Sequence, residues 1–401
     1  SFKLPDITSI AILPFRNLSG NPDHEYLSNG LAENIIFELS NSEDMLVISR
    51  NSSFYYKDKQ VNIQEIAEKL GVQYLLEGSV QLSGNSIRVS TQLVDALNGK
   101  NLWAERLDEK LDDLFRVQDK ITQKISEELE IKLNVGDQGT VWRDLIQDPV
   151  AFKIVVEYRS EFQKFSPSGY KKAEVLNKSL CERLPESFMC HNITGWTYYL
   201  QHSLGFADNP QEALEKARHH ANKALEKQET ANSHGMLALI SMKENNVELA
   251  FKHIDRALEL GPNETDVLAM GGFMKLRLDP GNAIILNERL FRKDPFPAPH
   301  FIRNLALNHM ILNNNQKAQA IFQSILDMNL DHAKFVAEIY RHLSVISHFE
   351  NDPGKAKEYT ELSLKKQPSQ TIAAVEKTYK NWTSREFFDR YFQALKNLGF
   401  P

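Results

Sequence analysis

The first 130 residues show two hydrophobic periods, one typical of strands and one of helices. The run at 9–15 is almost continuously apolar, as expected for a strand buried on both faces. Pro14 cannot donate to a ladder, so this strand ends there or lies at an edge. From 24 to 40 the period changes, and apolar residues recur on one face of an expected helix: Leu27, Leu31, Ile35 and Leu39.

The next segment continues the alternation of strand and helix. Residues 45–49 predict a second strand, and 63–70 predict a short helix. Gly71 stops this helix because glycine adopts the left-handed cap conformation without steric cost. The order so far is strand, helix, strand, helix.

A hairpin signal comes next. Residues 72–82 and 86–97 are extended, and Ser83-Gly84-Asn85 between them is typical of a hairpin turn. A third extended piece lies at 102–106, and a long amphipathic helix is expected over 111–133. These elements together predict an α/β sandwich with a mixed sheet.

Glu77-Gly78 falls within the first strand of this hairpin. A glycine inside a strand indicates a bulge or a close backbone approach, so we expect one of these at Gly78. Glu77 is expected to pair with a neighbouring cation.

From residue 148 onward the sequence is helical and repetitive. A small residue on a helix is followed by a proline twelve positions later, which ends that helix, at Ala173 and Pro185, Ala250 and Pro262, Ala283 and Pro295, and Ala356 and Pro368. Two more units, around Ala217 and Ala318, keep the helix but lack the proline. Small residues let paired helices approach closely, so we predict six helix pairs.

The change of period defines the expected domain organisation. We predict an α/β domain over 1–135, a linker over 136–148, an all-α repeat superhelix over 149–370 and capping helices over 371–401. Ala250 is expected where two helices of one repeat touch. Ala221, in the most irregular unit, is expected to tolerate a larger side chain.

Charge and composition narrow the function classes. The 401 residues carry a net charge of −6, which argues against a nucleic-acid-binding face spread over the whole chain, although a local basic patch stays open. No stretch approaches the ~18 apolar residues of a membrane span. Two cysteines, Cys181 and Cys190, are too few for a disulfide-stapled fold and are expected to be reduced thiols. We expect a cytoplasmic location, or a periplasmic one if a membrane helix precedes a chain that begins at serine.

Catalytic and cofactor motifs are absent from the sequence. Asp95 is a lone acid at a strand end, whereas a nucleotide cyclase needs two metal-binding aspartates. No phosphate-binding glycine loop occurs, and the adjacent His219 and His220 are expected to be solvated surface. We therefore expect no catalytic residue, cofactor or metal in this chain.

One candidate ligand site follows the second predicted strand. Backbone amides, hydroxyls and cations at a strand's carboxyl end can hold an anion, and the residues of this kind are Arg50, Asn51, Ser52, Ser53 and Lys57. The alternative is that Asn51 and the serines cap a turn or short helix, while Arg50 pairs with an acid.

The second candidate surface is the concave face of the repeats, which the first helix of each unit lines. Aromatic, amide and imidazole groups on these helices suit recognition of a protein or peptide: Trp196, Tyr198, His202, Asn304 and Asn308. The alternative is that Trp196 and Tyr199 fill the core between units.

Two family resemblances accompany these patterns. The offset between alanine and proline resembles the tetratricopeptide repeat. Residues 4–130 resemble a TolB-amino-terminal-like domain of bacterial regulatory proteins in the strings Ser9-Ile-Ala-Ile-Leu-Pro-Phe15, Glu25-Tyr-Leu-Ser-Asn-Gly-Leu31, Val47-Ile-Ser-Arg-Asn-Ser-Ser-Phe54, Glu77-Gly-Ser-Val80 and Leu102-Trp-Ala-Glu-Arg106.

The resemblance implies a regulatory role. In that family the domain is usually followed by tetratricopeptide repeats and preceded by a class III adenylate/guanylate cyclase domain or a winged-helix DNA-binding domain. The lead-in Leu4-Pro5-Asp6 is similar to the linker after a cyclase. We therefore expect a protein-interaction module that regulates an upstream catalytic domain. The alternatives are a ligand-sensing α/β domain with a repeat arm and the effector region of a winged-helix regulator.

Overall fold

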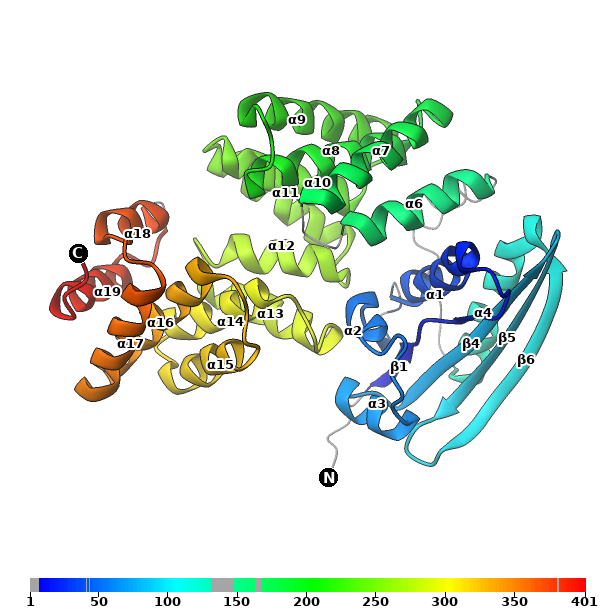
Figure 1. The fold of residues 1–401 in the computed structure, drawn as a ribbon, viewed down its shortest axis with the longest axis horizontal. Helices are drawn as coiled ribbons and strands as arrows, with labels where there is room; N and C mark the ends of the chain where they lie inside the picture. The colour runs from blue at the N-terminus through cyan, green and yellow to red at the C-terminus, as the bar shows by residue number, and fades with distance from the viewer. Residues whose placement is uncertain (1–6, 41, 43, 131–147, 163–166, 381) are drawn as a thin grey trace. The chain divides into compact units, whose positions relative to one another are not determined.

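The computed structural model describes residues 7–40, 42, 44–130, 148–162, 167–380 and 382–401 (Figure 1). They form two compact units, one of Ser1–Val267 with Arg292–Phe296 and one of Leu268–Phe291 with Pro297–Pro401. The predicted linker at 136–148 lies outside the described residues except for Asp148. The domain boundaries expected from the sequence stay a prediction.

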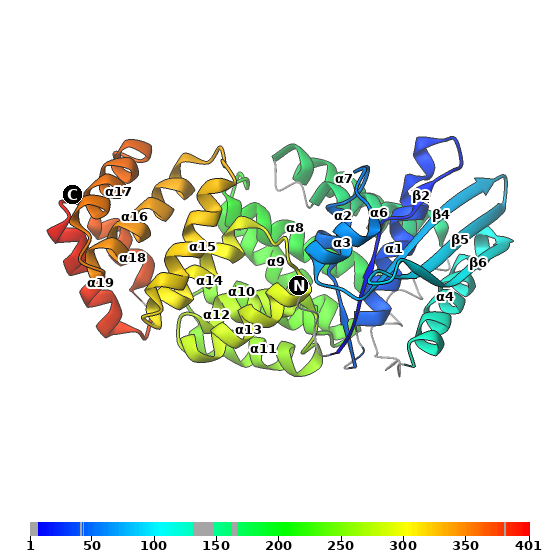
Figure 2. The ribbon, with the colours of Figure 1, turned by 90° about the horizontal axis from the view of Figure 1, so that it is seen from below.

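A mixed sheet forms the amino-terminal part of the first unit. Its strand order is β3-β1-β4-β5-β6, with β2 beside β4. Figure 2 labels β2, β4, β5 and β6 of this sheet. β1 pairs in parallel with β3 and β4, whereas β4, β5 and β6 run antiparallel. The strands are β1 (Thr8–Ile12), β2 (Arg16–Asn17), β3 (Met45–Val47), β4 (Tyr74–Ser83), β5 (Ser86–Asp95) and β6 (Lys100–Lys110). This confirms the predicted mixed α/β architecture.

Helices cover both faces of β1, which explains its continuous apolar sequence. Ile10 and Ile12 face the core beneath α1 (Glu25–Ser40) and α4 (Leu114–Glu128). Ala11 and Leu13 face the opposite core, beneath α3 (Ile63–Leu70). β1 ends at Ile12, two residues before Pro14, and Gly71 caps α3 at φ +71°.

The expected close approach at Gly78 is present. A Cβ atom added there would lie 2.7 Å from the carbonyl oxygen of Ser90 on β5 and 3.1 Å from the ring of Phe15. The expectation for Glu77 was different from what the structure shows. Its carboxylate accepts a hydrogen bond from the Gln92 side-chain amide across the sheet, instead of pairing with a cation.

β6 forms one edge of the sheet, because it pairs with β5 alone. Most of its residues are exposed, including Glu105, Arg106, Asp108 and Lys110. Asp108 forms an ion pair with Arg88 of β5 at 2.6 Å.

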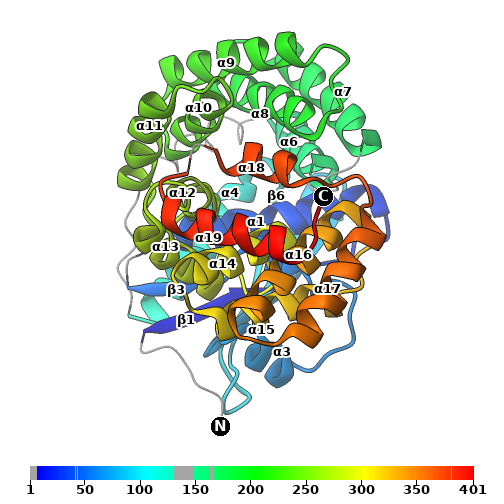
Figure 3. The ribbon, with the colours of Figure 1, turned by 90° about the vertical axis from the view of Figure 1, so that its left-hand side faces the viewer.

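Helix pairs build the rest of the chain. Six pairs follow one another along the described residues, and α18 and α19 end the chain (Figure 3). The paired helices that lie wholly in the first unit are α6 (Pro149–Phe162), α7 (Pro167–Arg183), α8 (Phe188–Leu204), α9 (Pro210–Lys227), α10 (Ala231–Lys243) and α11 (Val247–Leu260). The later helices are α12 (Thr265–Lys275), α13 (Pro280–Lys293), α14 (Pro299–Ile311), α15 (Asn315–Asp327), α16 (Ala333–Phe349), α17 (Pro353–Lys366), α18 (Ile372–Tyr379) and α19 (Arg385–Asn397).

The prolines mark helix ends as predicted. Four second helices, α7, α11, α13 and α17, each end two residues before Pro185, Pro262, Pro295 or Pro368. Within the described chain, the alanine of every second helix is buried, with an exposed fraction of 0 or 1%. The repeat register inferred from the sequence is therefore confirmed.

Ala221 does not fit its expectation. It lies on α9 with an exposed fraction of 0%, as Ala217 and Ala250 do. The irregular spacing of this unit therefore does not loosen its packing, and the expected tolerance of a larger side chain is unsupported.

Ala250→Leu is expected to lower the free energy of unfolding by about 1–3 kcal/mol, because it forces three extra carbon atoms between α10 and α11. Urea unfolding followed by circular dichroism measures this change. Ala320→Leu is the matched control, since Ala320 is exposed on α15. Equal stabilities for the two variants would contradict the observed register.

The two cysteines are bonded to each other, which corrects the expectation of reduced thiols. Cys181 lies near the end of α7, and Cys190 lies near the start of α8. The turn between these helices brings their Cα atoms to 5.0 Å. A separation of nine residues therefore suits a disulfide here, because it spans a tight turn between antiparallel helices.

Reduction of this disulfide is expected to destabilise the first unit. Closing a loop of this length removes about 2.5 kcal/mol of entropy from the unfolded chain in the loop-closure model. Thermal unfolding with and without a phosphine reductant measures the effect. The double variant Cys181→Ser/Cys190→Ser should melt at the temperature of the reduced chain and ignore the reductant, and a reductant response in that variant would contradict the assignment.

A buried polar network holds the carboxyl-terminal helices of the second unit. Arg341 on α16 donates from Nε to the Tyr391 hydroxyl of α19 at 3.1 Å, and from a terminal nitrogen to Gln370 Oε1 at 3.1 Å. Gln370 in turn donates to Ser363 Oγ on α17 at 2.7 Å. The hydroxyl of Tyr391 also lies 3.1 Å from Nδ1 of His342. Arg341 is 7% exposed and His342 0%, so these side chains have little or no contact with water. The network supplies the hydrogen bonds that water would otherwise make to them.

An ion pair extends this network. Arg303 on α14 binds the Glu338 carboxylate on α16 at 3.0 Å. Burial alone would raise the pKa of Glu338, but Arg303, His342 and Arg341 hold it well below its usual range.

Candidate functional site

The candidate anion site lies where β3 ends and α2 (Arg50–Phe54) begins. Ser49 starts this helix because its hydroxyl accepts the Ser52 backbone N–H at 3.2 Å. The segment 292–296 of the same unit lies against α2. The backbone N–H of Ser49 donates to the Lys293 carbonyl at 2.6 Å.

The Asp294 carboxylate occupies this site. Its Oδ1 accepts hydrogen bonds from the Ser49 hydroxyl at 2.8 Å, from the Ser52 hydroxyl at 2.5 Å and from the Asn51 amide at 3.4 Å. Asp294 is 8% exposed and Ser52 0%. A buried carboxylate needs such donors, because burial without them costs several kcal/mol.

Phe296 provides a second point of attachment. Its backbone N–H donates to Ser52 Oγ at 2.9 Å, and its carbonyl accepts from the Asn51 side-chain amide at 2.6 Å. Its ring centroid lies 4.7 Å from that of Tyr55. Ser49, Asn51, Ser52 and Tyr55 are called the cradle below.

The remaining predicted anion ligands point elsewhere. Arg50 forms an ion pair with Glu33 of α1, as the alternative interpretation had it. Lys57 pairs with Glu25 at 2.6 Å. Ser53 is buried. Of the five predicted residues, Asn51 and Ser52 donate to the Asp294 carboxylate, and Arg50, Ser53 and Lys57 are not among its donors given above. The sequence analysis missed Ser49, which directly precedes the predicted residues and also donates to Asp294.

Together with burial, the charge of the Asp294 carboxylate in the cradle raises the pKa of a second acid, Asp266. Burial raises the pKa of Asp266 on α12, Arg159 opposes this shift, and the charge of Asp294 adds to it. The cradle therefore holds an anion whose field reaches beyond its own hydrogen bonds.

The predicted concave-face residues of the first unit are engaged within the chain. Trp196 on α8 donates from Nε1 to Asn232 Oδ1 on α10 at 2.7 Å, which links two neighbouring helix pairs. Tyr198 stacks on His220 of α9 with ring centroids 6.2 Å apart. His202 Nδ1 lies 2.7 Å from the Pro210 carbonyl.

Asn308, in the second unit, is buried and not available on a surface. Its exposed fraction is 0%, its amide nitrogen donates to the Pro280 carbonyl at 2.9 Å, and its Oδ1 accepts from Asn287 at 3.3 Å. Asn304 is 3% exposed and accepts from Arg303 at 2.8 Å. Asn308 links α14 to α13, and Asn304 binds its neighbour on α14, so the expectation that these two buried amides face a partner is corrected.

Histidine pairs were not foreseen in the sequence. His220 does not lie on the solvated surface as expected, because its Nδ1 is 3.2 Å from Nδ1 of His191. His234 and His253 form the same contact at 2.9 Å. Burial lowers the pKa values of His220 and His253 to about 4. In both helix pairs, one histidine is the fourth residue of the first helix and the other lies three residues after the buried alanine of the second helix. The repeat register therefore contained the information needed to predict these histidine pairs.

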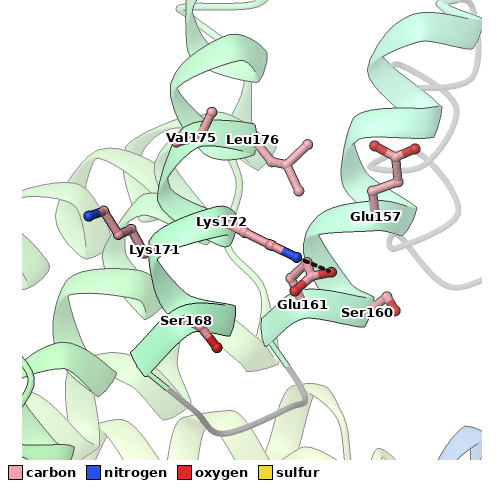
Figure 4. Close-up of a pocket in the computed structure, with 8 residues that line it drawn as sticks. All are labelled: Glu157, Ser160, Glu161, Ser168, Lys171, Lys172, Val175 and Leu176. Atoms are coloured by element: carbon pink, nitrogen blue, oxygen red, sulfur yellow. Dashed lines mark ion pairs between the residues drawn. The ribbon is translucent and has the colours of Figure 1, made fainter.

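A hollow of about 710 Å³ lies between α6 and α7 (Figure 4). Glu161 and Lys172 form an ion pair at 4.0 Å within it. The lining mixes charged, hydroxyl and apolar groups: Glu157, Ser160, Glu161, Ser168, Lys171, Lys172, Val175 and Leu176. In the part of the chain that the structure describes, no three histidine, cysteine or acidic side chains gather as a metal site, and no helix is long and apolar enough to cross a membrane.

Comparisons with known proteins bear on both parts of the chain. Residues 6–124 match the model of the HilA/YgeH-like transcriptional regulator, second domain. The "Putative adenylate cyclase 3" of Rhizobium meliloti (strain 1021) is 39% identical over 189 residues, which cover 47% of this chain and 32% of that protein. The chain thus spans about a third of the length of the curated relative it matches.

Two solved structures are similar in fold to parts of the chain. PilF of Pseudomonas aeruginosa is 19% identical, with a TM-score of 0.37 over 52% of this chain and 93% of that one. TolB of Acinetobacter baumannii is 17% identical, with a TM-score of 0.23 over 31% of this chain and 29% of that one. The chain combines an α/β domain with an array of helix pairs.

Proposed function

We propose that this chain is the regulatory, protein-interaction portion of a bacterial signalling protein whose catalytic domain is a class III nucleotide cyclase preceding it. The similarity to the "Putative adenylate cyclase 3" of Rhizobium meliloti carries this proposal, since 189 residues align at 39% identity. The aligned part is about a third of that protein, which leaves room for a catalytic domain in the remainder.

The array supports an interaction role through its construction. In each helix pair the small residues pack the two helices closely together. The outward side chains are therefore free to vary for recognition of a partner. A protein or peptide partner bound there would transmit its presence to the catalytic domain.

A second candidate is the effector region of a DNA-binding regulator. The match of residues 6–124 to the HilA/YgeH-like second domain favours it. In that case a winged-helix domain precedes the chain, and this chain itself binds no nucleic acid. A third candidate, sensing of a small ligand by the α/β domain, has the weakest support because Asp294 already occupies the cradle.

The compartment is proposed to be the cytoplasm, where a cyclase meets its nucleotide substrate. The disulfide between Cys181 and Cys190 favours the periplasmic alternative, because disulfides persist in oxidising compartments. Alkylation of thiols in intact cells, followed by mass spectrometry of the two cysteines, separates these locations.

One experiment distinguishes the first two candidates. The full-length reading frame is cloned, and the purified protein is assayed with ATP or GTP and Mn²⁺ and, separately, for DNA binding. Cyclic nucleotide formed by the full-length protein, with none formed by residues 1–401 alone, supports the cyclase proposal. DNA binding by the full-length protein without cyclase activity overturns it in favour of the second candidate.

A further inference from the structure

We propose that the cradle is a recognition site for short peptides that carry an aspartate and, two residues later, an aromatic side chain. In this chain Asp294-Pro295-Phe296 occupies it in cis, and a partner segment of the same chemistry can occupy it in trans. This inference concerns the α/β domain and goes beyond the proposed role of the helical array.

The contacts are those of peptide recognition. Main-chain bonds fix the segment at both ends, from the Ser49 N–H to the Lys293 carbonyl and from the Phe296 N–H to Ser52 Oγ. Two side chains of the segment are also bound. Hydroxyls donate to the Asp294 carboxylate, and the ring of Tyr55 contacts the ring of Phe296. Main-chain bonds supply affinity and the side-chain contacts supply specificity.

Pro295 prepares the segment for this site. Proline fixes its own φ near −65° and disfavours the helical region for the preceding residue, and α13 accordingly ends at Lys293, one residue before Asp294. A segment already restricted in this way loses less conformational entropy when it binds.

The cradle reads a carboxylate in preference to a phosphate. Its donors to the anion are two hydroxyls and one amide, all neutral. The two nearby cations that the sequence suggested are engaged with acids, Arg50 with Glu33 and Lys57 with Glu25. None of these three hydrogen bonds comes from a cation, so the second charge of a phosphate would gain no charged donor from them.

The site lies close enough to solvent for exchange. Asn51 is exposed, Tyr55 is 51% exposed, and Phe296 is half-buried. The cis segment is tethered and therefore acts at an effective concentration in the millimolar range. A partner peptide must overcome this advantage, so trans binding is weak until the cis segment is removed.

The test uses the full chain and a fluorescein-labelled peptide with the sequence of residues 292–298. The double variant Asp294→Ala/Phe296→Ala vacates the cradle. By fluorescence anisotropy, we expect it to bind the peptide at least tenfold more tightly than the wild-type chain does. Addition of Ser52→Ala to this variant, or replacement of the aspartate of the peptide by alanine, is expected to lower affinity at least fivefold. Inorganic phosphate at the same concentration is expected not to compete.

Equal affinity of the vacated and wild-type chains overturns the proposal, as does binding that ignores Ser52→Ala or is displaced by phosphate. If circular dichroism shows that the double variant is unfolded, the wild-type chain serves instead. Hydrogen exchange at the Phe296 amide is then measured with excess unlabelled peptide. Faster exchange supports displacement of the cis segment, and unchanged exchange with peptide in millimolar excess overturns it.

Discussion

Replacement of Arg341 by alanine is expected to lower the free energy of unfolding by about 3–5 kcal/mol. The variant leaves Tyr391 and Gln370 without their buried donor and opens a cavity at the junction of α16, α17 and α19. A buried group that loses its partner costs about 1–3 kcal/mol, and the cavity adds to this. Urea unfolding of the full chain, followed by far-UV circular dichroism, measures the change.

Arg385→Ala is the matched control, because Arg385 is exposed on α19 of the same bundle. We expect it to change the free energy of unfolding by no more than about 0.5 kcal/mol. Arg341→Lys keeps the charge but not the forked donors, so an intermediate loss is expected. A loss below about 1 kcal/mol for Arg341→Ala would show that the network does not stabilise the helices.

Acidification from pH 6.5 to pH 4 is expected to destabilise the second unit by about 3 kcal/mol through His342 alone. Burial lowers the pKa of His342 to about 4, against 6.5 for an exposed imidazole. Between pH 6.5 and pH 4, the imidazole of His342 is protonated in the unfolded chain but neutral in the folded chain. Its full contribution to the free energy of unfolding is therefore present above pH 6.5 and is lost as the pH falls towards 4. Each pH unit in this window corresponds to about 1.4 kcal/mol.

The window between pH 6.5 and pH 5 separates the histidines from the carboxyl groups, because most carboxyl groups stay ionised there. Urea midpoints are measured across it for the wild type and for His342→Gln. The variant should lose the share of the dependence that His342 contributes. His220, His253 and His300, whose pKa values burial also lowers to about 4, contribute in the same direction in both proteins. A wild-type stability that is flat or rises on acidification would contradict the prediction.

The repeat architecture could be predicted because local signals repeat. An alanine at the helix contact and a proline twelve residues later constrain nearby backbone and packing, so Ala250 with Pro262 placed the end of α11 correctly. The ends of β1 and of α3 were also marked by local signals, since Pro14 follows β1 closely and Gly71 caps α3.

The candidate site was only half predictable, because its occupant comes from far away in the chain. Hydroxyls at the end of β3 indicated an anion. Asp294 lies more than 240 residues later, and nothing in the sequence around it indicates that it binds at β3. The disulfide was missed for a different reason. Its cysteines were judged by their number, whereas their position on either side of a helix turn decided the pairing.

The charged edge of the sheet has a consequence for how the protein behaves at high concentration. On the side away from β5, alternate residues of β6 point backbone N–H and C=O groups outward, and such an edge is a template for adding a strand from another molecule. Glu105, Arg106, Asp108 and Lys110 oppose such growth, because a strand arriving at this edge would have to bury or repel their charges. These charges therefore disfavour fibril formation through the edge, where the sheet of the described residues ends with β6.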